Sequence, residues 1–236
     1  MPVFYFKQFS LNDDDCAMKI GTDAVLLGSW TQIKYEREIL DIGTGCGILA
    51  LMLAQKSTAT VDAVEIDKNA AGRATINFQN TLWNNRLNVV NAAFNDFAES
   101  TTKVYDMAVC NPPFFSDSLL SGSHARNVAR HNVNLSPEKL LCGVAKLLKP
   151  GGIFNLILPF DQEKMFRQWC TMYHFFPLLI TRVIPVYGKT PNRTLFSLIK
   201  ENNNFICIEN ELIIRMDSGK YSSDYTNLTK DFLLNS

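Results

Sequence analysis

Three glycines stand in the stretch Asp41-Ile42-Gly43-Thr44-Gly45-Cys46-Gly47, where an apolar run, residues 39–42, gives way to a helix-like segment, residues 47–56. Glycine tolerates positive φ and lets a ligand approach the backbone above the carboxyl end of a strand. The spacing differs from the dinucleotide pattern G-x-G-x-x-G, and no Lys-Ser or Lys-Thr follows as in a phosphate loop. Phosphate binding is therefore not favoured, although a turn that binds nothing would show the same glycines.

Glu65 stands near the end of the next apolar run, residues 61–66, and 20 residues after Gly45. An acidic residue at this spacing accepts hydrogen bonds from ribose hydroxyls. Glu65 and Asp67 could also be ordinary solvated carboxylates at the end of a strand. Combined with a glycine turn that lacks phosphate chemistry, Glu65 favours an adenosine with an amino-acid tail, which is S-adenosyl-L-methionine.

A second motif, Asn111-Pro112-Pro113-Phe114, follows the apolar run at residues 105–110. The prolines fix φ and lack an N–H, so the side-chain and backbone carbonyls here can act as rigid acceptors. Two such acceptors suit the hydrogens of a planar amine or amide, and Phe114 can supply a flat face for stacking. A strand that merely ends at Asn-Pro-Pro is the plain alternative. We predict methyl transfer to nitrogen, driven by positioning rather than by a strong base.

Short apolar runs alternate with longer helix-like segments from residue 39 onward, which is typical of β-α units that feed a parallel sheet. The predicted strands are 39–42, 61–66, 87–91, 105–110 and 153–158, and the predicted helices are 47–56, 68–83, 136–148 and 161–173. Three further strands at 178–187, 194–200 and 205–208 are expected to end the sheet with an antiparallel edge, before a terminal helix near 222–233. The first 38 residues contain a strand candidate, VFYFKQF, and an amphipathic helix near 23–34.

The composition is that of one globular domain, with 236 residues, 47% hydrophobic residues and a formal net charge of zero. A zero balance argues against a protein that coats nucleic acid without specificity. The six cysteines are scattered and are expected to be reduced thiols of a cytoplasmic protein. We expect neither export nor membrane insertion, because no basic leader and no long apolar stretch is present. We expect the protein to be a monomer. We expect Asp13-Asp14-Asp15 to form a solvated loop, and we predict no metal site, because no partner ligands accompany these carboxylates.

DIGTGCG, VEID and NPPF, in this order, resemble the class I S-adenosylmethionine-dependent methyltransferases of the amino-methylating N-P-P-[FY] type, over about residues 39–160. The flanking stretches FKQF, MKIGTDAVLLGSW, FFSDSLLSGSHARNVARHNVNLSPEKLL and YSSDYTNLTKDFLL resemble the bacterial tRNA methyltransferases that act on adenine N6 next to the anticodon of a valine tRNA. The resemblance implies a Rossmann-like α/β fold, with a seven-stranded, mostly parallel sheet, an antiparallel edge and helices on both faces. It also implies that residues 1–38 cap the cofactor site of a methyltransferase domain, residues 39–236.

The same resemblance implies roles for individual residues. Asn111 and Pro112 would bind the target amine, with Phe114 stacked on the adenine. Many relatives place an Asp after the third strand, toward the cofactor adenine, whereas this chain has Ala93 and Phe94 there, so backbone groups or Asp96 would substitute. The residues expected to hold the cofactor are Thr22, Asp41, Gly43, Gly45, Gly47, Glu65, Ala93 and Phe94.

Charge is segregated along the chain although it sums to zero. Residues 122–149 carry five basic residues against one acid, and residues 182–193 carry three basic residues and no acid. Residues 201–236, by contrast, carry six acids against three basic residues. We predict that basic residues near the catalytic edge bind RNA phosphates, although solvated surface residues would look the same. The predicted RNA contacts are Arg126, Arg130, Arg182, Lys189 and Arg193.

Two other functions fit parts of the pattern. A methyltransferase that modifies a glutamine amide of a protein translation factor would use the same N-P-P-[FY] chemistry, but would not require the basic segments. A cofactor-binding RNA chaperone without catalysis would keep its cellular effect when Asn111 is replaced. Methylation of adenine in DNA is a weaker variant, because no separate target-recognition domain is evident.

Overall fold

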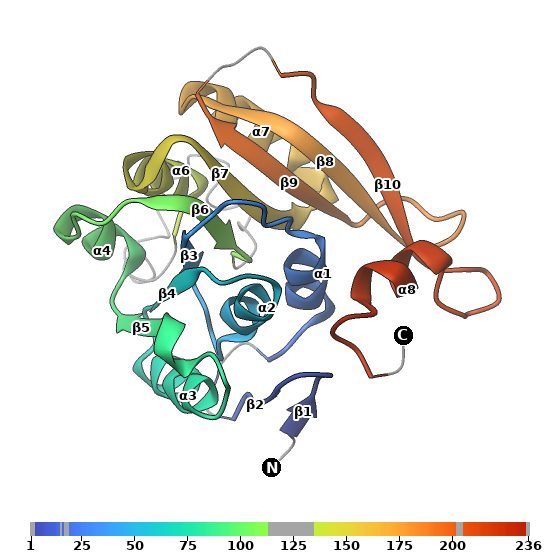
Figure 1. The fold of residues 1–236 in the computed structure, drawn as a ribbon. Coiled ribbons are helices and arrows are strands. Elements are labelled where there is room, and N and C mark those ends of the chain that lie inside the picture. Colours follow the sequence, from blue (N-terminus) through green and yellow to red (C-terminus); the bar gives the residue numbers. More distant parts are fainter. Residues whose placement is uncertain (1–2, 15, 17–18, 113–134, 202–204, 235–236) are drawn as a thin grey trace, which may run out of the picture.

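The computed structural model describes residues 3–14, 16, 19–112, 135–201 and 205–234, and its centre is an eight-stranded sheet (Figure 1). The strand order is β10-β8-β9-β7-β6-β3-β4-β5. Buried β-branched and aliphatic residues dominate the inner strands, as expected of a sheet that is covered on both faces. The strands are β3 (Glu38–Ile42), β4 (Thr60–Glu65), β5 (Leu87–Asn91), β6 (Tyr105–Cys110), β7 (Leu148–Pro159), β8 (Phe175–Val186), β9 (Arg193–Lys200) and β10 (Ile208–Arg215).

Seven of these eight strands run in the same direction, and β9 alone is antiparallel to its two neighbours. The carboxyl ends of the seven strands therefore lie along one edge of the sheet, which we call the carboxyl edge. The predicted α/β class and mostly parallel sheet are confirmed. The predicted number of strands is wrong by one, and the outermost strand β10 is parallel to β8 rather than antiparallel.

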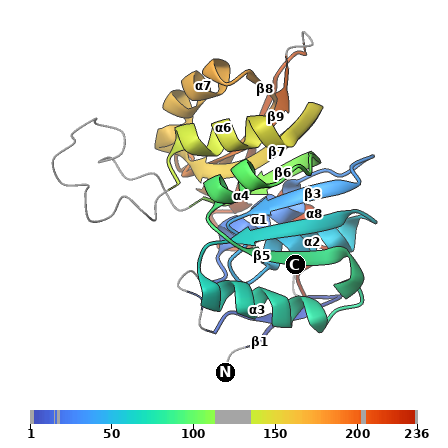
Figure 2. The same ribbon diagram turned by 90° about the vertical axis from the view of Figure 1, so that its left-hand side faces the viewer.

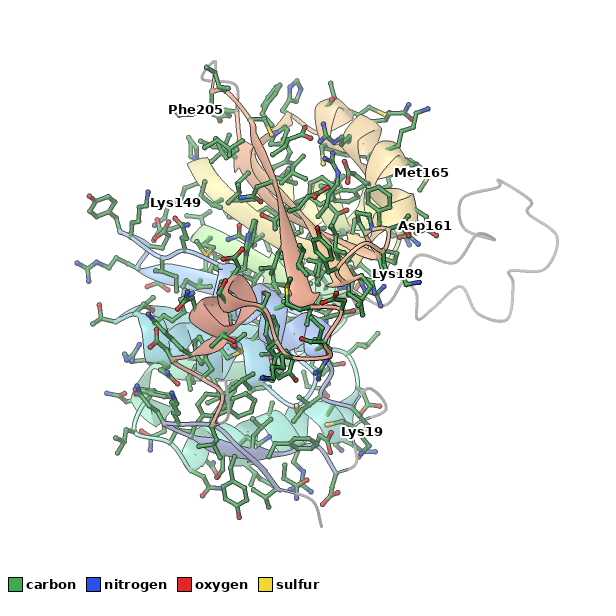
Figure 3. All side chains as sticks on the ribbon, turned by 90° about the vertical axis from the view of Figure 1, so that its right-hand side faces the viewer. Lys19, Lys149, Asp161, Met165, Lys189 and Phe205 are labelled. Carbon is green, nitrogen blue, oxygen red and sulfur yellow. The ribbon has the colours of Figure 1, made fainter. Side chains whose placement is uncertain are left out.

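The strand predicted at 205–208 is wrong, because the pairing with β8 begins only at Ile208. The apolar run Phe205-Ile206 that suggested it is exposed, and Figure 3 shows Phe205 at the far tip of the molecule. The observed strand β10 carries three polar residues in its first half and is mostly exposed. Backbone hydrogen bonds to β8 hold this edge strand, and few of its side chains are buried. Its sequence therefore lacks the hydrophobic pattern by which a strand is predicted.

Helices cover both faces of the sheet (Figures 1 and 2). The side chains of adjacent residues in a strand point to opposite faces, so Ile39 belongs to one hydrophobic cluster and Leu40 to the other. Helices α1, α2, α3 and α8 pack on the first cluster, and α4, α6 and α7 on the second. The helices are α1 (Thr22–Trp30), α2 (Ile48–Lys56), α3 (Lys68–Gln79), α4 (Phe94–Ser100), α6 (Pro137–Leu147), α7 (Glu163–Met172) and α8 (Ser223–Thr229), with 3-10 turns η1 (Asn84–Arg86) and η2 (Phe160–Gln162).

Three helices differ from the prediction. Helix α1 is not amphipathic, because residues 24–30 are all buried between α2, α8 and the sheet. Helix α8 begins as predicted, with the Ser222 side chain accepting a hydrogen bond from the Tyr225 N–H, but it ends at Thr229. Helix α4 was not predicted, since its seven residues are too few to show a clear period. No helix in the described ranges has the length and apolar character that a membrane span needs.

The N-terminal segment forms two short antiparallel strands, β1 (Val3–Tyr5) and β2 (Ser10–Asn12), rather than the single predicted strand. This hairpin is separate from the large sheet and lies against α3. Asn77 of α3 holds it, because its side-chain amide donates to the Asn12 carbonyl at 2.8 Å and accepts from the Asn12 N–H at 3.1 Å.

Helices α4 and α6 pack closely at Gly143, and this contact gives a stability prediction. A Cβ at Gly143 would lie 2.6 Å from Cε1 of the buried Phe94 ring, whereas a Cβ at Gly72, inside α3, would meet nothing within 4 Å. We expect Gly143→Ala to lower the free energy of unfolding by roughly 1–3 kcal/mol through overpacking. The matched Gly72→Ala should raise it by up to about 1 kcal/mol. Urea unfolding measures both, and equal effects of the two substitutions would contradict the packing described here.

Candidate functional site

The carboxyl edge brings the glycine turn and the Asn111-Pro112 corner together. In the β3–β6 register Ile42 pairs with Cys110, and in the β3–β4 register Ile42 pairs with Val64. The residues that follow these pairs, Gly43, Asn111 and Glu65, therefore leave three adjacent strands at the same level. Neighbouring strands are about 4.8 Å apart, so the three segments lie within reach of one small ligand.

The glycine turn is built from backbone hydrogen bonds and positive φ angles. The Gly43 and Thr44 N–H groups donate to the Val64 carbonyl at 2.8 and 3.1 Å. The φ values of Gly43, Gly45 and Gly47 are 71°, 57° and 93°, a region that residues with a Cβ rarely adopt. Gly47 is also needed for packing, because a Cβ there would lie 2.4 Å from Cε1 of Phe78. A Cβ at Gly43 or Gly45 would instead enter open space, which leaves room above the turn.

Asp41 lies beneath this turn and is fully buried. Its Oδ2 accepts hydrogen bonds from the Thr44 hydroxyl at 2.6 Å and from the Ala50 N–H at 3.1 Å. Its other oxygen, Oδ1, has no hydrogen-bond donor among the described residues. Burial, with a smaller contribution from the charge of Glu65, raises the pKa of Asp41 to about 7, although the two hydrogen bonds act to lower it. Asp41 thus joins the end of β3 to the first turn of α2.

Glu65 connects the glycine turn to the end of β4. Its Oε2 accepts from the Gly45 N–H at 2.8 Å, and its Oε1 accepts from the Asp67 N–H at 2.9 Å. Each carboxylate oxygen can accept a second hydrogen bond, so a ligand hydroxyl can still bind here. Asp67, which the sequence left as a possible solvated carboxylate, caps α3 by accepting from the Ala70 N–H at 2.8 Å.

The residues after β5 border the same edge. Asn91 donates to the Glu65 carbonyl at 2.9 Å, and the Ala92 N–H donates to the same carbonyl at 3.0 Å. Ala93 is the residue that precedes α4, and the Phe94 ring is buried in the α4–α6 contact. The backbone at Ala93 and Phe94, rather than the Phe94 ring, is therefore the part that can face a ligand. Asp96 is exposed in the first turn of α4.

Asn111 and Pro112 begin the loop after β6, with Asn111 half-buried and Pro112 buried. The preceding residue, Cys110, has a pKa well above its ordinary value because it is buried, and the charges of Asp41 and Glu65 raise it further. Both carboxylates are therefore close to the end of β6. Phe114, Arg126 and Arg130 lie outside the described residues, so the structure does not place them.

The segment before α1 packs against the glycine turn. Asp13 is buried, with 2% of its surface exposed, and its Oδ2 accepts from the Ile20 N–H at 3.0 Å, so the predicted solvated loop is wrong at this residue. Burial, together with the nearby Cys16, raises the pKa of Cys46 to about 12, and burial also raises the pKa of Cys16. Thr22 is exposed at the first position of α1. All six cysteines are unbridged.

Two of the predicted RNA contacts have partners inside the protein. The Arg182 guanidinium donates to Glu163 at 3.0 and 2.6 Å and to Glu209 at 2.8 Å. The Arg193 guanidinium donates to Asp23 of α1 at 2.9 Å. Local sequence could not show these ion pairs, because each partner lies on a distant segment. Lys189 is exposed, and Figure 3 places it with Asp161 on the side of the molecule opposite to Lys149.

Comparisons with known proteins agree on the type of domain. Residues 16–159 match the family model described as "Methyltransferase small domain". A protein of Bacteroides fragilis named tRNA1(Val) (adenine(37)-N6)-methyltransferase is 43% identical over 236 residues, which cover 99% of this chain and 98% of that protein. A protein of the same name from Flavobacterium psychrophilum is 39% identical over 98% of this chain and 99% of its own length.

Solved structures share the fold at low identity. A predicted O-methyltransferase from Agrobacterium tumefaciens superposes with a TM-score of 0.71 at 20% identity, over 89% of this chain and 96% of that one. A putative class I S-adenosylmethionine-dependent methyltransferase from Listeria monocytogenes superposes with a TM-score of 0.57 at 14% identity, over 88% of this chain and 67% of that one.

The buried carboxyl of Asp41 gives a prediction for the protein without ligand. Its pKa is about 7 in the folded chain, against an ordinary value of 3.8, so the unfolded chain loses this proton first as pH rises. Stability therefore falls between about pH 4 and pH 7. Asp41→Asn abolishes this titration. We expect the stability of the unmodified protein, relative to this variant, to fall by at most about 1.4 kcal/mol per pH unit in that window. Urea unfolding across the window tests it, and a difference that does not change with pH would contradict it.

Proposed function

The chain belongs to the family of tRNA1(Val) (adenine(37)-N6)-methyltransferases, and on that premise we propose that its carboxyl edge binds S-adenosyl-L-methionine and methylates the N6 amine of an adenine in tRNA. The observation that carries the proposal is the register of β3 with β6, in which Ile42 pairs with Cys110. This register supports the proposal because it brings the glycine turn at Gly43 next to Asn111.

The residues at the edge fit this cofactor. Open space lies above Gly43 and Gly45, Asp41 Oδ1 is a buried acceptor that lacks a donor among the described residues, and Glu65 presents two oriented oxygens. When bound, the cofactor supplies a methyl group activated by a positively charged sulfur. We assign the ribose hydroxyls to Glu65 and the contact with the cofactor adenine to the backbone at Ala93 and Phe94. The methionine part is assigned to Asp41, Gly43, Gly45, Gly47 and Thr22.

Asn111 and Pro112 hold the acceptor nitrogen. The Asn111 side-chain carbonyl and the backbone carbonyls of this corner accept hydrogen bonds from the two amine hydrogens of an adenine. Pro112 keeps the corner rigid because its φ is fixed and it has no N–H to donate. Two accepted hydrogen bonds increase electron density on a nitrogen whose lone pair is otherwise delocalised into the ring. We propose that Phe114 stacks on the same adenine, and that positioning supplies most of the rate enhancement.

The substrate assignment rests on the relatives, which match this chain over nearly its full length and carry one name. We propose a valine tRNA with adenine 37, next to the anticodon, as the target. We further propose that the enzyme acts in the cytoplasm, as a monomer, with residues 1–38 as a cap over the cofactor. Buried Cys16 supports that cap, because it lies close enough to Cys46 and Glu65 for their charges to interact.

The direct test incubates the purified protein with isotopically labelled S-adenosyl-L-methionine and either bulk tRNA or cellular protein, both from cells that lack the gene. We expect label in tRNA, and mass spectrometry should find N6-methyladenosine at position 37 of the valine tRNA. Label in protein alone would overturn the proposal in favour of a glutamine amide.

Asn111→Ala tests the acceptor site. We expect the rate of methyl transfer to fall by at least about 100-fold, because an oriented hydrogen-bond acceptor is lost in the transition state. The dissociation constant of the cofactor should stay close to that of the unmodified protein. Asn84→Ala, in the exposed turn η1, is the matched control and should change neither quantity. Normal turnover by Asn111→Ala would refute catalysis at this corner and favour a non-catalytic RNA chaperone.

Glu65→Gln tests the ribose contact. The variant keeps one carbonyl acceptor but loses a charged oxygen, so we expect the cofactor to bind roughly ten-fold more weakly, which corresponds to a charged hydrogen bond of about 1.5 kcal/mol. Isothermal titration calorimetry with S-adenosylhomocysteine measures this change. Glu99→Gln, on the exposed side of α4, is the control. An unchanged affinity in Glu65→Gln would show that Glu65 serves only to hold the glycine turn.

A further inference from the structure

Two loops at the far end of the carboxyl edge present an exposed group of planar and basic side chains. We propose that this group, Tyr187, Lys189 and Arg215, hereafter the rim patch, is a docking surface for the anticodon arm of the tRNA. The inference rests on the proposed function and extends it to a surface whose three residues are brought together only by the fold. Lys189 alone was among the predicted RNA contacts.

The rim patch shares the edge of the sheet with the site. Tyr187 and Lys189 follow the carboxyl end of β8, and Arg215 ends β10. Both strands are parallel to β7 and β6, so these residues leave the sheet on the same side as Asn111. Figure 3 shows Lys189 on the same side of the molecule as Asp161, which lies in the η2 turn that follows β7.

The backbone of the rim patch is held firmly. Val186 pairs with Arg215 in the β8–β10 register, and the Tyr187 N–H donates to the Arg215 carbonyl at 2.8 Å. A tight turn at Gly188 follows, closed by the Lys189 N–H, which donates to the Val186 carbonyl at 3.0 Å. The three side chains are therefore displayed from one anchored corner, which lowers the entropy lost on binding.

Arg215 packs against Tyr221, which in turn stacks on Tyr225. Its Cζ lies 4.1 Å from the centroid of the Tyr221 ring, and the Tyr221 and Tyr225 rings stack at 4.8 Å with an interplanar angle of 26°. Both groups lie against the Tyr221 ring, which keeps 39% of its surface exposed. Arg215 is exposed, and its guanidinium is also held by donation to the Gly219 carbonyl at 2.7 Å. A planar guanidinium held in this way stacks readily on a base.

Tyr187 has 56% of its surface exposed. Exposed aromatic rings next to cations are the usual elements of surfaces that stack nucleic-acid bases. The two loops carry three cations, Lys189, Arg215 and Lys220, against one acid, Asp217. This excess of positive charge beside an aromatic ring favours a polyanion that carries planar groups. Under the proposed function that partner is a tRNA.

The distance from the site suits the anticodon arm. Strand β8 is three positions from β6 in the sheet and β10 is four, which at about 4.8 Å per strand gives roughly 14–19 Å. Stacked nucleotides rise about 3.4 Å each along one strand. An adenine held at Asn111 therefore places nucleotides about four to six positions away at the rim patch. The internal ion pairs of Arg182 and Arg193 occupy the guanidinium groups that the sequence had suggested for this role.

The test measures binding of a synthetic anticodon stem-loop of valine tRNA to the full-length protein at several salt concentrations. We expect Tyr187→Ala to raise Kd about ten-fold, because stacking on one base is lost. Lys189→Ala should reduce the slope of log K against log salt by about one. Arg215→Lys, which keeps the charge but not the plane, should raise Kd and leave the slope unchanged. The KM for S-adenosyl-L-methionine should not move in any of the three.

The matched control is the double substitution of Lys34 and Tyr35 by alanine. These two residues are also exposed and adjacent, with 89% of the Tyr35 surface accessible, but they precede β3 and lie at the opposite edge of the sheet. The control should bind the stem-loop as the unmodified protein does. Equal weakening by the control and the patch variants would contradict a specific surface.

Unchanged Kd and salt slope in a Tyr187→Ala/Lys189→Ala variant, while the unmodified protein methylates the stem-loop, would overturn the rim patch and leave the proposed function intact. No methylation of any RNA by the unmodified protein would overturn the proposed function itself. Transfer of label to a protein, with a KM for that protein raised by the same variants, would assign the surface to a protein partner instead.

Discussion

Parallel pairing of β3 with β6 requires Gly43 and Asn111 to leave the sheet side by side, although 67 residues separate them in the chain. The remaining features of the site depend on this constraint. Strand β4, on the other side of β3, brings Glu65 to the same level, and the same parallel direction brings the ends of β8 and β10 to that edge. The proposed cofactor site, the proposed site for the target adenine and the rim patch are thereby aligned along one edge.

The buried carboxylates hold the donor side of the site in shape. Asp41 is fully buried and binds the Thr44 hydroxyl and the Ala50 N–H, and Glu65 binds the Gly45 N–H. Burial of an acid is unfavourable and raises the pKa of Asp41 to about 7. The turn therefore keeps a buried acceptor, Asp41 Oδ1, that has no donor among the described residues, which suits a cationic ligand. The buried acid lowers the stability of the ligand-free protein. Binding of the cofactor to the folded state would raise the free energy of unfolding again.

Much of the site could be predicted from the sequence, because parallel strands place their carboxyl ends at one edge. That rule was sufficient to bring Asp41, Glu65 and Asn111 together. It could not show the partners of side chains on distant segments, such as the ion pair between Arg193 and Asp23 or the buried position of Asp13. Strand β10 was misplaced because it is an exposed edge strand with little hydrophobic pattern. By sequence alone Arg215 falls in the acidic segment 201–236, and only the pairing of β10 with β8 places it next to Tyr187.

The measurement that tests the central claim most directly is a structure of the protein with S-adenosylhomocysteine and the anticodon stem-loop bound together. We predict that the cofactor product contacts the glycine turn and Glu65, and that the flipped adenine contacts Asn111 on the same edge of the sheet. A complex in which the adenine lies at any other edge, with Asn111 in contact with neither ligand, would contradict the account.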